Sequence, residues 1–357
     1  MQQLVQLRGR GAPQNPKNRF VDAEYVADGD WLDTLGEDEP DPRTEFLRDH
    51  TRGIISRNES PDIPFETSVN PYRGCEHGCI YCFARPTHEY LGFSAGLDFE
   101  TRILVKHEAP ELLRRELASP RWTPQPIAMS GVTDPYQPVE RKLEITRRCL
   151  EVLAEFRNPV AMVTKNHLVT RDIDLLRELA AHQAAVVNIS ITTLNEKLQR
   201  VMEPRASTPA RRLEAVRRLS EAGIPVRVLV APVVPGLTDH EMTAILAASA
   251  EAGASAASYI PLRLPHGLKG LFEDWLETHF PDRKDKVLNR IREMRGGKLY
   301  DSEWGTRMRG EGLFADQYEA LFGATTRKLG LVRTFPPLSA AAFRRPHNPA
   351  GQMGLFD

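Results

Sequence analysis

The sequence predicts an α/β protein built on a partial (β/α)6 barrel of the TIM type, with an N-terminal extension and a helical C-terminal region. Two observations lead to this prediction. From about residue 60 onward, strand-like and helix-like segments alternate, which is typical of parallel β/α units rather than of a meander. The strand-like segments are also apolar enough to be buried on both faces; they are residues 66–72, 126–131, 160–164, 185–192, 226–231 and 255–262.

Amphipathic helices are predicted between these strands, at residues 140–156, 171–183, 209–222 and 239–252. Pro209 suits the first turn of the third helix after Thr208. Thr238 and Glu241 have the spacing of a capping box at the start of the fourth. A further strand at 101–106 and a helix at 110–118 are inserted between the first and second barrel strands.

The chain divides into four predicted parts. Residues 1–60 form an N-terminal extension, first basic and then acidic, and residues 61–265 form the barrel. Residues 266–340 change to charge-rich helical segments, among them 271–279 and 285–294. Residues 341–357 are expected to form a flexible tail after a Pro-rich stretch.

Composition indicates a soluble cytoplasmic protein without a membrane partner. Hydrophobic residues make up 41% of the chain, and no apolar run reaches the roughly 18 to 20 residues that cross a bilayer. The first residues lack the apolar core of a signal peptide. Four cysteines, three of them close together, favour a metal site over a disulfide framework. The net charge of −1 does not by itself indicate a nucleic-acid partner, so such contacts must come from local patches.

Cys75, Cys79 and Cys82 follow the first predicted strand, at the rim where (β/α) barrels carry their active sites. Three thiolates can hold three irons of a 4Fe-4S cubane and leave the remaining iron an open position. A structural zinc site is the alternative, with His77 or His88 as the missing ligand.

The remaining cysteine, Cys149, is predicted to be a buried structural thiol. It falls on the helix predicted at 140–156 and shares the spacing of core residues with Ile145, Val152, Leu153 and Phe156.

The cysteine spacing, with Tyr81 just before the last cysteine, resembles the signature of the radical S-adenosylmethionine (SAM) superfamily. The resemblance implies a barrel of the radical SAM type with a 4Fe-4S cluster and SAM as cofactors. In that family the open iron chelates the amino and carboxylate groups of SAM. An electron from the cluster then cleaves SAM to a 5′-deoxyadenosyl radical. A reducing partner such as flavodoxin or ferredoxin is therefore implied.

Residues 66–264 resemble the branch that contains spore photoproduct lyase and the radical-type DNA repair photolyases. The segments that carry the likeness are Val163-Thr164-Lys165, Asn188-Ile189-Ser190-Ile191, Glu203-Pro204 and Val230-Ala231-Pro232. By this resemblance Tyr81 borders the adenine of SAM, while Lys165 and Ser190 contact its methionine or ribose part. DNA is the substrate class that the resemblance implies.

Two further residues are predicted to border the cofactor. Gly131, at a strand end, would let a ligand approach the backbone. Arg205 could pair with a carboxylate or a phosphate, or could form a surface salt bridge. The loop from Asp134 to Pro138 faces the substrate or is a simple turn.

The chain departs from spore photoproduct lyase at one position that matters for catalysis. In that enzyme a cysteine soon after the second strand returns a hydrogen atom to the substrate, whereas residues 130–134 here contain none. Activity on spore photoproduct itself is therefore not expected, and no catalytic residue is assigned.

Both ends of the chain carry short motifs. Gln352, Leu355 and Phe356 resemble the peptide by which bacterial polymerases and repair proteins bind the sliding clamp, although a chance match stays open. At the other end, Arg8-Gly9-Arg10-Gly11 could touch phosphate or wrap over the barrel.

Together these patterns predict a radical SAM enzyme that acts on DNA, in lesion repair or base modification. Two rivals stay open: the same chemistry on RNA, protein or a small metabolite, and a non-catalytic iron-sulfur or zinc adaptor recruited to the clamp.

Overall fold

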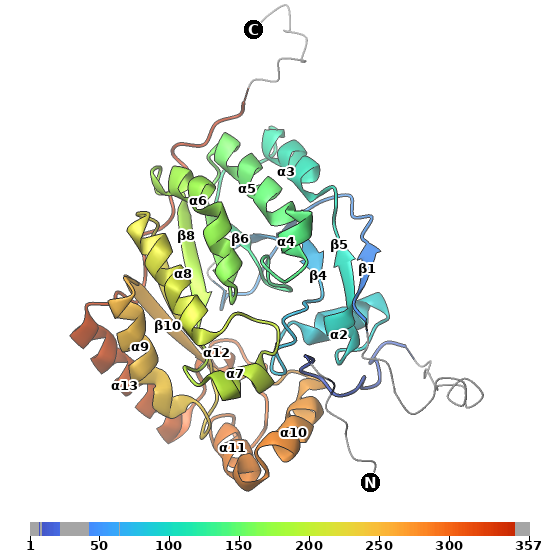
Figure 1. Ribbon diagram of the computed structural model, residues 1–357, viewed down its shortest axis with the longest axis vertical. Coiled ribbons are helices and arrows are strands. Elements are labelled where there is room, and N and C mark those ends of the chain that lie inside the picture. The colour runs from blue at the N-terminus through green and yellow to red at the C-terminus, as the bar shows by residue number, and fades with distance from the viewer. Residues whose placement is uncertain (1–6, 8, 22–42, 64, 347–357) are drawn as a thin grey trace, which may run out of the picture.

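Seven strands form the main sheet of the computed structural model, which describes residues 7, 9–21, 43–63 and 65–346 (Figure 1). Six of them are parallel, and they confirm the α/β fold class and the six predicted strands, except that the first ends at Val69 and its predicted last residue, Tyr72, lies in a second sheet. A short antiparallel strand completes the sheet at the β3 edge. The order across the sheet is β2 (Ile55–Arg57), β3 (Thr67–Val69), β6 (Ile127–Met129), β7 (Val160–Thr164), β8 (Ala185–Ser190), β9 (Val226–Val233) and β10 (Ala256–Pro261).

Because these strands are parallel, their carboxyl ends meet at one edge of the sheet. Val69, Met129, Thr164, Ser190 and Val233 end their strands there. The loops that leave this edge therefore carry the residues predicted to bind cofactor.

Helices cover the outer face of the sheet and bury their apolar stripes against it (Figure 1). They are α5 (Ile145–Phe156), α6 (Ile173–Ala180), α8 (Pro209–Glu221) and α9 (Met242–Glu251), with α7 (Glu196–Met202) and the 3₁₀ segment η2 (His167–Asp172) in the connections. The N-cap of α8 is as predicted, since the Thr208 hydroxyl accepts a hydrogen bond from Arg211 N.

Two helix predictions need correction. The helix predicted at 140–156 is split into α4 (Glu140–Leu143) and α5 by Glu144, whose φ is 51°. The capping box is wrong, because the Thr238 hydroxyl accepts from Val234 N at 2.9 Å and the Glu241 carboxylate accepts from Thr193 and Leu194 instead. A 3₁₀ turn, η3 (Asp239–Glu241), precedes α9.

The inserted strand and helix are found as β5 (Arg102–Val105) and α3 (Ala109–Ala118). β5 belongs to a second, small sheet, between β1 (Glu45–Arg48) and β4 (Tyr72–Arg73). Between β4 and β5 lie η1 (Arg85–Leu91) and α2 (Asp98–Thr101). The strands β1 and β2 were not predicted; they are short and mostly exposed, so they lack an apolar pattern.

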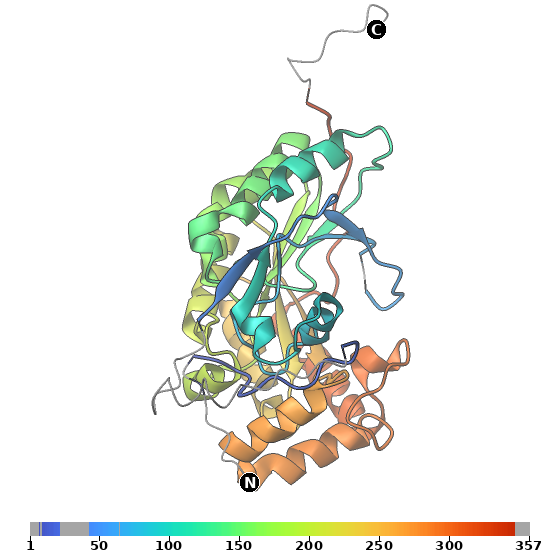
Figure 2. The same cartoon turned by 90° about the vertical axis from the view of Figure 1, so that its right-hand side faces the viewer.

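The C-terminal region is helical, as predicted, with α10 (Leu268–His279), α11 (Pro281–Glu293), α12 (Thr306–Arg309) and α13 (Gly312–Leu329). Helices α10 and α11 lie beyond the carboxyl edge of the sheet (Figures 1 and 2). They share a second apolar core with Ile80 and Tyr81 of the cysteine loop. None of the described helices is long and apolar enough to cross a membrane. The division of the chain at residues 60, 265 and 340 stays a prediction.

Candidate functional site

The cysteine-bearing loop, residues 74–82, follows β4 and is fixed to its surroundings by backbone hydrogen bonds. Cys75 N donates to Phe99 O at 2.9 Å, Ile80 N to Met202 O at 3.0 Å and Cys82 N to Cys79 O at 3.1 Å. Cys75 and Cys79 are buried, and Cys82 is partly exposed. The three predicted ligands therefore lie on one loop of defined conformation.

An N-terminal segment packs against this loop. Gly11 N and Ala12 N donate to the buried Glu100 carboxylate at 2.9 and 2.8 Å, and Arg85 pairs with the same carboxylate. A Cβ atom on Gly11 would lie 1.8 Å from Gly78 O, and one on Gly78 would lie 2.7 Å from the Glu100 carboxylate. The described part of the predicted basic motif thus contacts the cysteine loop itself.

The Asp134–Pro138 loop also contacts the cysteine loop and supports it. The Asp134 carboxylate accepts from Thr164 Oγ1 at 2.7 Å and from Lys165 N at 2.8 Å, and lies 3.3 Å from His77 Nδ1. Burial would raise the pKa of Asp134, but His77 and these hydrogen bonds lower it below its usual value. Asp134 is therefore an ionised anchor for His77.

Gln137 and Tyr136 are also turned inward, so the interpretation of this loop as substrate-facing is wrong for these two side chains. Gln137 Oε1 accepts from Glu76 N at 3.0 Å, and Tyr136 donates to Asp172 at 3.1 Å. Both side chains are fully buried. The loop is a buried support of the site.

Burial strongly disfavours thiolates in this loop. It raises the pKa values of Cys75, Cys79 and Cys82, and the neighbouring Asp134 carboxylate adds to the effect at Cys75. Bound cationic iron would supply the charge that keeps such thiolates ionised. The donor set therefore fits an iron-sulfur cluster.

A network of buried charges lies beside the cysteine loop at the ends of β7 and β8. Lys165 Nζ donates to Ser190 Oγ at 2.7 Å and to Ala231 O at 3.1 Å, and lies 3.3 Å from Glu203 Oε1. The Glu203 carboxylate also bonds Tyr81 and Arg212. The structure thus brings the predicted residues Tyr81, Lys165 and Ser190 together.

Glu203 is ionised within this network. Burial opposes its charge, but Arg212 and Lys165 outweigh burial and hold the pKa of Glu203 well below its usual range. Its partner Arg212 also donates to Ser190 O at 3.0 Å, which ties α8 to the end of β8.

The other two predicted cofactor contacts lie at the edges of this arrangement. Gly131 has a φ of +136°, and among the described residues only Asn70 comes near its missing side chain, at 3.7 Å, so the backbone is open to a ligand there. Arg205 pairs with Glu76 at 3.2 Å, and its backbone N–H donates to His77 O at 3.2 Å. Their roles in binding cofactor stay predictions.

The two histidines proposed as zinc ligands are engaged elsewhere. His77 Nδ1 lies 3.3 Å from Asp134 and its Nε2 lies 3.1 Å from Asn166 Nδ2, while His88 Nε2 lies 2.9 Å from Arg102 O. A zinc ion bound through His77 would have to break these contacts, whereas His88 Nδ1 has no hydrogen-bond partner among the described residues. Cys149 is fully buried in the main core, as predicted.

The sequence did not single out Arg85, Glu100 or Thr192, all of which are buried around the site. A charged residue in the sequence carries no sign of its burial, so their long-range pairing could not be inferred. The proposed clamp peptide, Gln352 to Phe356, lies outside the described residues and stays a prediction.

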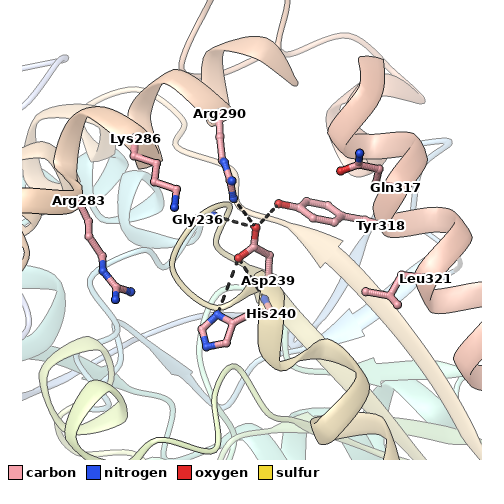
Figure 3. A pocket seen from close by; sticks show the side chains of 9 residues that line it. All are labelled: Gly236, Asp239, His240, Arg283, Lys286, Arg290, Gln317, Tyr318 and Leu321. Carbon is pink, nitrogen blue, oxygen red and sulfur yellow. Dashed lines mark hydrogen bonds and ion pairs between the residues drawn. The ribbon is translucent and has the colours of Figure 1, made fainter.

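A cavity of about 590 Å³ opens between α11 and α13, beside the loop that follows β9 (Figure 3). Asp239 lies at its base and accepts hydrogen bonds from Gly236 N, Arg290 and Tyr318 at 2.9 to 3.0 Å. This carboxylate joins the barrel to both helices. Arg283 and Lys286 of α11 extend into the opening (Figure 3).

The fold and the site together define a class of barrel enzymes that carry three cysteines on one loop. Comparison of the sequence with known protein families identifies the same class. The model of the Radical SAM superfamily matches residues 69–248, half of the chain. The chain belongs to this superfamily, whose members use a 4Fe-4S cluster and SAM as cofactors.

Proteins of similar sequence agree with this family assignment, but they do not identify the reaction of this chain. An uncharacterized protein of Mycobacterium tuberculosis is 37% identical over 234 residues, which are 65% of this chain and 68% of that protein. One of Methanocaldococcus jannaschii is 28% identical over 199 residues, 56% of this chain and 71% of the other. The radical SAM Nα-GlyT isomerase of Pseudomonas phage M6 is 27% identical over 175 residues, 48% of this chain and 34% of the isomerase.

Among solved structures, spore photoproduct lyase complexed with dinucleoside spore photoproduct has a TM-score of 0.55 with this chain. The match covers 81% of each chain at 16% identity. This similarity shows a shared fold.

Proposed function

We propose that the chain is a radical SAM enzyme in which Cys75, Cys79 and Cys82 each hold one iron of the cluster, and which acts on DNA. The observation that carries the proposal is the placement of the three cysteines on a braced loop beside Tyr81, Lys165 and Ser190. When bound, cluster and SAM supply a 5′-deoxyadenosyl radical that abstracts a hydrogen atom. The protein itself holds the charged groups of these ligands in place and excludes water from the site.

The side chains at the ends of β7 and β8 suit the polar parts of SAM. Lys165 offers an ammonium to a carboxylate, and its Nζ lies 5.6 Å from the centre of the Tyr81 ring. Ser190 Oγ and Thr192 Oγ1 are hydroxyls within 2.7 and 3.3 Å of the same ammonium. Arg205 would join them once it is released from Glu76, and Gly131 would admit the ligand to the backbone.

DNA as the substrate is supported by the fold shared with spore photoproduct lyase. A different lesion or a base modification fits better than spore photoproduct itself. The loop after β6 has no cysteine, and the Cys149 thiol is buried in the core. A hydrogen donor at the position used by that lyase is therefore missing.

The first prediction concerns the ligand set. Anaerobic protein reconstituted with iron and sulfide should bind about four irons per chain and, with dithionite and SAM, release 5′-deoxyadenosine. Cys75→Ala, Cys79→Ala or Cys82→Ala should each abolish both, because two thiolates hold a cubane poorly. Cys149→Ala is the matched control and should retain iron and cleavage.

Two results would contradict this assignment: full cleavage by any of the three loop variants, or equal loss of iron in Cys149→Ala. A non-catalytic adaptor would bind iron or zinc but release no 5′-deoxyadenosine. The substrate class is tested separately with damaged oligonucleotides, RNA and peptides. Stimulation of SAM cleavage by RNA or peptide alone would reject DNA.

A further inference from the structure

Two large aromatic side chains are exposed at the carboxyl edge of the sheet. Phe83 directly follows Cys82 and is 52% exposed, and Trp304 precedes α12 and is 56% exposed. Phe83 lies on the segment that leaves the cysteine loop, and Trp304 lies on the segment that covers the end of β10. Rings of this size usually bury most of their apolar surface, so an exposed pair needs an explanation.

Each ring carries an arginine. The guanidinium carbon of Arg263 lies 5.0 Å from the centre of the Phe83 ring, and that of Arg307 lies 4.0 Å from the centre of the Trp304 ring. These are cation–π distances. Arg263 itself follows β10, two residues beyond Pro261.

The two ring and arginine pairs form one surface. Arg263 Nη1 lies 3.1 Å from Met308 Sδ, the residue after Arg307. Arg295 donates to Leu262 O, Thr306 O and Arg307 O at 3.2, 3.0 and 2.9 Å, which ties α12 to the end of β10. We call Phe83, Arg263, Trp304 and Arg307 the aromatic–arginine patch.

Arg263 lacks an acidic partner among the described residues. Its contacts there are a thioether and an aromatic ring. Asp62, the acid whose charge acts on it, already accepts from Arg307 Nε at 2.6 Å and from Gly305 N at 2.8 Å. A partly buried guanidinium without an anion is left ready to bind one.

We infer that the aromatic–arginine patch binds an unpaired stretch of the DNA strand, with bases stacked on Phe83 and Trp304 and a phosphate held by Arg263. The inference rests on the proposed function and names the surface that serves it. Single-stranded nucleic acid is bound by aromatic rings interleaved with cations, because every base has a stacking face and every link a charge. An enzyme that reacts at a base must also take that base out of the duplex stack.

The test measures fluorescence anisotropy of a labelled single-stranded oligonucleotide on the reconstituted full-length chain under anaerobic conditions. Phe83→Ala and Trp304→Ala should each weaken binding by about tenfold through lost stacking. Arg263→Gln should weaken binding and lower the slope of log affinity against log salt by about 0.7, the value for one phosphate contact on a single strand. Phe83→Tyr should retain binding, since a stacking face remains.

Phe46→Ala is the matched control. Phe46 is 49% exposed on β1, outside the patch, and its loss should leave binding unchanged. Iron content and the thermal midpoint of unfolding verify that each variant is folded.

The outcomes separate this inference from the function on which it rests. If the wild-type chain binds DNA and Phe83→Ala, Trp304→Ala and Arg263→Gln all bind it equally well, the patch assignment is overturned while DNA stays the substrate. If the wild-type chain binds no oligonucleotide, the DNA proposal itself fails. Tighter binding of RNA of the same sequence would overturn DNA as the occupant of the patch.

Discussion

Glu203 shows what a single residue does at this site. Its carboxylate is fully buried and balances Arg212 and Lys165. Glu203→Gln removes that charge and leaves two buried cations, so the free energy of unfolding should fall by about 3 kcal/mol. Chemical denaturation of iron-matched samples measures this change.

An exposed glutamate provides the control for Glu203. Glu221 pairs with Arg217 on the surface of α8, where both side chains are more than half exposed. Glu221→Gln should change the free energy of unfolding by less than about 0.5 kcal/mol. A Glu203→Gln variant as stable as Glu221→Gln would show that the buried network adds nothing to stability.

His88 should make stability depend on pH. Burial lowers the pKa of His88 to about 4, whereas an unfolded chain holds it near 6.5. The unfolded state therefore binds the proton first, and stability is lost as pH falls from 6.5 to 4, by about 3 kcal/mol in total. His88→Gln should flatten this part of the stability profile, measured by denaturation at several pH values. Parallel profiles for the two proteins would exclude His88 as the cause.

Among the elements, the N-terminal segment around Gly11 acts on the site from outside the barrel. Gly11→Ala places a methyl group 1.8 Å from Gly78 O, so the segment must move away from the cysteine loop. The cluster should then be lost to a chelator several-fold faster. The absorbance of the cluster over time measures that rate.

Gly270→Ala is the control for this prediction. Gly270 lies in α10, where no atom of the described part of the chain comes within 4 Å of its missing side chain, and alanine there should add up to about 1 kcal/mol of helix stability. Chelation at the wild-type rate in Gly11→Ala would show that the segment does not protect the loop.

Elements with a strong local pattern were predictable and those held by distant partners were not. The six buried strands have apolar runs bounded by turns, and the start of α8 has its cap and proline in sequence. The capping box failed because Thr193 and Leu194, far away in sequence, compete for Glu241. The burial of Tyr136 and Gln137 could not be predicted for the same reason, because their hydrogen-bond partners lie far away in sequence.

At the scale of the whole molecule, the C-terminal region is joined to the barrel by core packing. Phe322 and Tyr318 of α13 belong to the same apolar core as β7, β8 and β9. Val332 pairs with Ala256 of β10, which continues the sheet edge. We therefore expect α13 and the barrel to unfold together.

Phe322 and Leu321 are neighbours on α13 with opposite environments, which makes a matched test of this coupling. Phe322 is 1% exposed and Leu321 is 41% exposed. Phe322→Ala should cost about 3 to 5 kcal/mol, and the loss should shift the unfolding of α13 and of the barrel together, because the cavity opens in their common core. Leu321→Ala should cost less than about 1 kcal/mol. Tryptophan fluorescence reports on Trp122 in the main core, and circular dichroism reports on all helices including α13. A separate early transition in the circular dichroism of Phe322→Ala would instead mean that α13 is an independent unit packed on a self-sufficient barrel.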